Sequence, residues 1–67
     1  MTRQTMSTRF AGEQLAALYH RRDTIEARIE YGFTAGDIGR LRLEQIANEI
    51  RVYREAYRAA AKREQVQ

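Results

Sequence analysis

The chain has 67 residues and a net charge of +3, from twelve Lys and Arg against nine Asp and Glu. A chain this short forms one small domain, whose core rarely suffices without a disulfide, a metal or a partner subunit. It has no cysteine and a single histidine, so disulfides are excluded and a metal site is disfavoured. A partner subunit is the stabilising device that remains, and no cofactor is expected.

Membrane insertion and export are also disfavoured. No stretch approaches the roughly 18 consecutive apolar residues of a membrane span. The N-terminal region lacks the apolar segment and cleavage site of a signal peptide, and the absence of cysteine is consistent with a reducing compartment. We therefore expect a soluble, cytoplasmic protein that contacts no membrane.

The composition predicts an all-α fold. Proline is absent, and the four glycines lie at positions 12, 32, 36 and 39. Strong helix formers such as Ala, Glu, Gln, Arg and Leu dominate the rest. Few residues therefore mark strands or loops.

The chain should reverse direction at residues 32–34. Gly32 can adopt the positive φ that ends a helix at low cost. Thr34 is then expected to cap the next helix by accepting from the backbone N–H of Asp37. Phe33 and Ile38 occupy the positions of a hydrophobic staple, which sets the angle at which the chain enters that helix.

The first helix is predicted over residues 9–31, after a flexible arm over residues 1–8. Ser7 or Thr8 can cap its first turn. Apolar residues then recur at the spacing of one helix face, which a single arginine interrupts. This face consists of Ala11, Leu15, Leu18, Arg22, Ile25 and Ile29.

The second helix is predicted over residues 35–62, followed by a frayed tail over residues 63–67. Gly36 and Gly39 each cost its first turns up to about 1 kcal/mol relative to alanine. Its main apolar face has the same spacing as the face of the first helix. This face consists of Leu43, Ile46, Ile50, Tyr53, Tyr57 and Ala60.

The two apolar faces match in register when the chain folds back at the turn. The match places Ile25 near Ile46 and Leu18 near Tyr53, and it places Ile29 near Leu41 and Leu43. Agreement between the turn signals and the register predicts a single domain over residues 1–67, an antiparallel two-helix hairpin.

The second helix carries a further apolar strip that the first helix cannot cover, because it lies more than about 100° around the helix from the main face. Small residues at its C-terminal end would allow close helix approach. We therefore predict a homodimer in which the second helices of two copies pair to give a four-helix arrangement. The predicted interface is Ile38, Leu41, Gln45, Val52, Ala56 and Ala59. The alternative is that Ala56 and Ala59 are ordinary solvent-facing alanines.

Four residues are candidates for binding a partner protein. Arg22 interrupts an apolar face, so it either extends to the edge of the helix pair, forms an ion pair with Glu49, or anchors a partner. Tyr31 and Phe33 flank the turn, and aromatic side chains at a rigid tip make good interface anchors. Tyr19 lies at the margin of the apolar face.

A row of cations follows the solvent face of the second helix. It consists of Arg51, Arg54, Arg58 and Lys62. Such a row could track phosphates, as in hairpin dimers of the Rop type that bind paired RNA loops. However, Arg51 with Glu55 and Arg40 with Glu44 have the i,i+4 spacing of an ordinary solvated helix, which is the interpretation we favour.

No catalytic set is apparent, because no Ser, Cys or Asp lies at a spacing from His20 that would indicate a nucleophile with its base. We therefore expect neither an enzyme nor a small-molecule substrate. The size, the lack of proline and the self-pairing hairpin resemble small phage-encoded accessory proteins that inhibit host machinery, such as phage anti-quorum-sensing proteins that bind a transcriptional activator and a pilus-assembly ATPase. The resemblance implies a non-enzymatic inhibitor or adaptor acting on a host regulator or ATPase in the host cytoplasm. The alternative is an RNA- or DNA-binding hairpin dimer.

Overall fold

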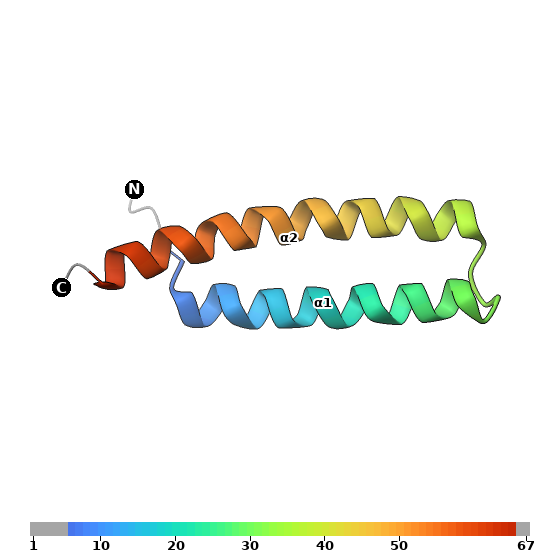
Figure 1. The fold of residues 1–67 in the computed structure, drawn as a ribbon, viewed down its shortest axis with the longest axis horizontal. Helices are drawn as coiled ribbons and strands as arrows, with labels where there is room; N and C mark the ends of the chain where they lie inside the picture. Colours follow the sequence, from blue (N-terminus) through green and yellow to red (C-terminus); the bar gives the residue numbers. More distant parts are fainter. Residues whose placement is uncertain (1–5, 66–67) are drawn as a thin grey trace.

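The computed structural model describes residues 6–65, which form two helices joined by a tight turn (Figure 1). Helix α1 spans Thr8–Glu30 and helix α2 spans Gly36–Gln65. The helices lie side by side in opposite directions, and no strand occurs in the described range. The predicted all-α helical hairpin is therefore confirmed. Most of the predicted arm, residues 1–5, and the end of the predicted tail, residues 66–67, lie outside the described residues.

The end of α1 is closed around a glycine. Gly32 has a φ of +79°. The N–H of Phe33 donates to the carbonyl of Arg28 at 2.8 Å, and the N–H of Gly32 donates to the carbonyl of Ile29 at 3.1 Å. This pair of bonds is the Schellman arrangement, in which a left-handed residue satisfies the last carbonyls of a helix. The role predicted for Gly32 is confirmed.

The start of α2 differs from the prediction. The hydroxyl of Thr34 accepts from Nε of Arg28 at 3.3 Å and does not cap α2, which begins at Gly36, one residue later than expected. The carboxylate of Asp37 accepts from the N–H of Ile38 at 2.9 Å. The negative charge of Asp37 still lies at the positive end of the helix dipole, which is stabilising.

The opposite end of the hairpin is tied by polar contacts. Ser7 caps α1, with its hydroxyl accepting from the N–H of Phe10 at 3.1 Å. One guanidinium nitrogen of Arg63 donates to the carbonyl of Met6 at 2.8 Å. This bond joins the chain in front of α1 to the last turn of α2.

The seam between α1 and α2 contains the core. Its side chains come from the two predicted faces, and none of the large ones is completely buried. Leu15, Tyr19, Ile25 and Tyr53 pack at the margins of the cluster of Leu18, Ile46 and Ile50. The buried apolar residues are Ala11, Leu18, Ile46, Ile50 and Ala60.

The two helices approach each other closely at Gly39. A Cβ atom at this position would overlap Cγ1 and Cδ1 of Ile29. Ile29 therefore lies over Gly39, and Leu41, which we expected beside it, is exposed. The glycine that we regarded only as a weak point in α2 makes room for a core side chain of α1.

Gly39→Ala should lower the free energy of unfolding by about 1 kcal/mol or more, because the added methyl group displaces Ile29. Gly12→Ala is the matched control, since its methyl group would lie 3.7 Å from the Tyr57 ring, in ordinary contact. This control should raise stability by up to about 1 kcal/mol through helix propensity. Urea denaturation followed by circular dichroism measures both variants. Stabilisation by both would contradict the close approach at Gly39.

Candidate binding surfaces

The apolar strip is the first of three surfaces that the hairpin leaves open. We define it by the predicted interface residues Ile38, Leu41, Gln45, Val52, Ala56 and Ala59. Ile38, Leu41 and Val52 are 51%, 58% and 61% exposed. Gln45 and Ala59 are exposed as well, whereas Ala56 is half-buried and offers less surface than we predicted. Three large apolar side chains of α2 therefore face away from the seam.

The aromatic tip, Tyr31 and Phe33, is the second surface. Both residues are 73% exposed at the turn. The staple predicted between Phe33 and Ile38 therefore leaves most of the Phe33 ring in water. Tyr19, the other aromatic candidate, is half-buried against the core and does not belong to the tip.

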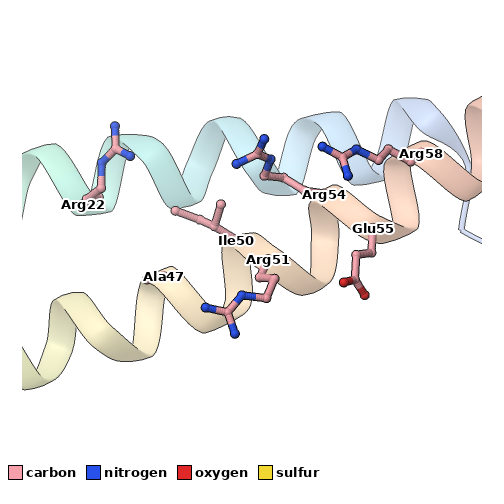
Figure 2. Close-up of a pocket in the computed structure, with 7 residues that line it drawn as sticks. All are labelled: Arg22, Ala47, Ile50, Arg51, Arg54, Glu55 and Arg58. Atoms are coloured by element: carbon pink, nitrogen blue, oxygen red, sulfur yellow. The ribbon is translucent and has the colours of Figure 1, made fainter.

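The arginine groove is the third surface, a depression of about 420 Å³ between the two helices (Figure 2). Ile50 projects between the helices and forms an apolar floor. The guanidinium groups of Arg54 and Arg58 point the same way, towards the side of Arg22, while Arg51 and Glu55 project from the other side of α2 (Figure 2). The groove is lined by Arg22 of α1 and by Ala47, Ile50, Arg51, Arg54, Glu55 and Arg58 of α2.

Three of the four groove arginines have no ionic partner in the part of the chain that the structure describes. Within residues 6–65, the ion pairs shorter than 4.0 Å involve only Arg9 and Arg22 among the cations. The predicted i,i+4 pairs, Arg51 with Glu55 and Arg40 with Glu44, are therefore not formed. The face is nevertheless solvated, as the favoured interpretation has it, because Arg51, Arg54 and Arg58 are all exposed. Their charges have no carboxylate partner among residues 6–65.

Arg22 extends from the seam to its edge, where it contacts its own helix. Its Nη2 lies 3.5 Å from a carboxylate oxygen of Asp23, and its Nε lies 3.5 Å from one of Glu26. Its guanidinium carbon lies 5.0 Å from the centroid of the Tyr19 ring, in cation–π contact. Of the alternatives for Arg22, the structure therefore shows extension to the edge, and the ion pair with Glu49 is not formed.

The groove differs from the predicted basic row at both ends. Lys62 is exposed but does not line the groove, whereas Arg22 does. We found the row by following α2 alone, so the contribution of α1 was missed. The register that sets Arg22 opposite Ile50 was the signal that could have found it.

A smaller depression of about 180 Å³ shares no residue with the arginine groove. It mixes charges of both signs. Its lining residues are Arg21, Ile25, Arg42, Gln45, Ile46 and Glu49. It therefore supplies arginines for control experiments on the groove.

Two other kinds of site, a metal centre and a membrane span, are absent from residues 6–65. No three His, Asp or Glu residues there are placed to hold a metal ion. Neither α1 nor α2 has a stretch long and apolar enough to cross a lipid bilayer. The three surfaces thus offer apolar contact and positive charge as means of binding.

No protein-family model, curated protein or solved structure matches the chain. The resemblance to phage-encoded inhibitors therefore stays a prediction.

Arg22→Gln should change the free energy of unfolding by less than about 1 kcal/mol, because both of its ion pairs are exposed to water. Leu18→Ala, one turn earlier on the same face, should cost about 2–4 kcal/mol because Leu18 is buried in the core. Chemical denaturation compares the two variants. Equal losses would place the Arg22 side chain in the core and not at its edge.

Proposed function

We propose that the protein is a non-enzymatic inhibitor or adaptor that binds another protein and works as a homodimer. The observation that carries the proposal is the apolar strip, where Ile38, Leu41 and Val52 are all more than half exposed. Apolar surface of this kind is removed from water most readily by a matching surface. A second copy of α2 provides one.

The dimensions of the hairpin support association. The chain exposes 5820 Å², whereas a compact protein of 7.8 kDa is expected to expose about 4,400 Å². The radius of gyration is 15.2 Å, against about 11 Å for a compact chain of this length. Stable protein interfaces bury about 800 Å² on each partner, which is less than the excess surface of the hairpin.

The binding of a partner protein is supported by the surface that the dimer would leave exposed, the aromatic tip. Tyr31 and Phe33 are 73% exposed at the turn and do not belong to the strip, so a dimer that pairs through α2 would leave their rings available. Exposed aromatic side chains are common anchors of protein interfaces. If the resemblance to phage-encoded inhibitors holds, the partner is a host regulator or ATPase.

Leu41→Glu and Val52→Glu should each convert the dimer into a monomer and lower its melting temperature, because a charge would be buried at the interface. Ala16→Glu is the matched control, since it adds the same charge at an exposed alanine of α1 and should leave the dimer intact. Light scattering at micromolar concentration reports the mass. A stable 7.8 kDa particle for the unmodified chain would remove the basis of the proposal.

The second candidate function is RNA or DNA binding by a hairpin dimer, which the uncompensated charges of Arg51, Arg54 and Arg58 support. This alternative predicts a gel shift of a labelled oligonucleotide that weakens steeply with salt. Arg54→Glu combined with Arg58→Glu should abolish the shift. Capture of one stoichiometric protein that resists nuclease treatment, with no gel shift, would exclude nucleic-acid binding.

A further inference from the structure

The arginine groove concentrates charge that the dimer proposal does not use. Its lining holds four arginines and one carboxylate, although the whole chain has a net charge of only +3. Clustered like charges repel one another, which disfavours the folded state slightly. A ligand that carries negative charge into the groove would relieve this repulsion and bind by the same interaction.

The shape of the groove restricts the ligand. Arg51, Arg54 and Arg58 repeat at i, i+3 and i+7 and so span about 10 Å along α2. Carboxylates on the two flanks of another helix would cover the same length, with one flank facing Arg54 and Arg58 and the other facing Arg51. The groove also follows the junction of α1 and α2, where a third helix can pack against both.

The floor of the groove points to a protein ligand. Ile50 gives it an apolar centre, and Ala47 lies beside Ile50 at one end of the lining (Figure 2). An aliphatic side chain can fill this centre, with carboxylates on either side that reach the guanidinium groups in bidentate pairs. An amphipathic acidic helix carries both features on one face.

Nucleic acid fits the same groove less well. Single strands bind largely through bases stacked on aromatic rings, and no aromatic side chain lines the groove. Tyr19, which lies beside the lining residue Arg22, already has the Arg22 guanidinium over its ring.

We propose that the arginine groove binds an acidic amphipathic helix of the partner protein, with an aliphatic side chain over Ile50 and carboxylates on Arg22, Arg51, Arg54 and Arg58. This inference rests on the protein-binding function proposed above and names the chemistry of the partner. Val52 and the rest of the apolar strip share no residue with the groove. A homodimer formed through the strip therefore presents two grooves.

The test uses a labelled helical peptide rich in alanine, with one central leucine flanked by glutamates at i±3 and i±4, and measures fluorescence anisotropy with the full chain. The same peptide with glutamine in place of glutamate should bind at least about tenfold more weakly. Arg54→Glu combined with Arg58→Glu should weaken binding of the acidic peptide by a similar factor. Ala47→Glu, which adds a carboxylate to the floor, should also weaken it.

The matched control is Arg21→Glu combined with Arg42→Glu, which changes the net charge equally but lies in the smaller depression. It should alter binding by less than about twofold. Circular dichroism establishes that every variant is folded. The inference is overturned if the acidic peptide fails to bind, if the control variant loses as much as the groove variant, or if a duplex RNA binds the groove more tightly than the peptide.

The two proposals fail in different ways. If the chain binds the peptide but light scattering shows a monomer, the homodimer proposal is disproved and the groove proposal stands. If the chain forms a dimer that Val52→Glu disrupts but does not bind the peptide, the groove proposal is disproved and the homodimer proposal stands. Val52→Glu should weaken peptide binding much less than Arg54→Glu combined with Arg58→Glu, because it replaces no arginine of the groove.

Discussion

Two helices packed as a pair bury only the side of each that faces the other, and the open surfaces of this hairpin follow from that geometry. The single apolar face of α1 is used in the seam. Helix α2 is apolar on two sides and basic on a third, so most of its circumference stays in water after the hairpin has formed. The core remains thin, with no large side chain completely buried. Further contacts of α2 with other molecules are the available route to a larger core.

Binding through the apolar strip and binding in the arginine groove would respond differently to salt. Association through Ile38, Leu41 and Val52 would depend on burial of apolar area, which salt does not weaken. Contacts in the groove would depend on charge, and salt weakens such contacts. The screening length is about 10 Å at 0.1 M ionic strength. Since the two surfaces share no residue, one helix can support self-association and partner binding independently.

The fold could be predicted from local sequence signals, whereas the details that depend on contacts between distant residues could not. Gly32 predicts the turn, because the end of helix α1 depends on the backbone conformation of this one residue. The hydroxyl of Thr34 was assigned to the wrong partner because an arginine of the preceding turn competes for it. The contact of Gly39 with Ile29 depends on the distance between helices, which helix periodicity does not contain. Arg22 joins the groove for the same reason, since its place depends on the other helix.

Helix α1 begins and α2 ends at the same pole of the molecule, opposite the turn (Figure 1). A tension applied between these two ends would load the seam in an unzipping geometry, in which layers of contact open one after another and do not share the force. The bond from Arg63 to the carbonyl of Met6 closes this pole and would be among the first to open. Under such a tension the two helices would separate from this pole towards the turn, although each helix is continuous along its length.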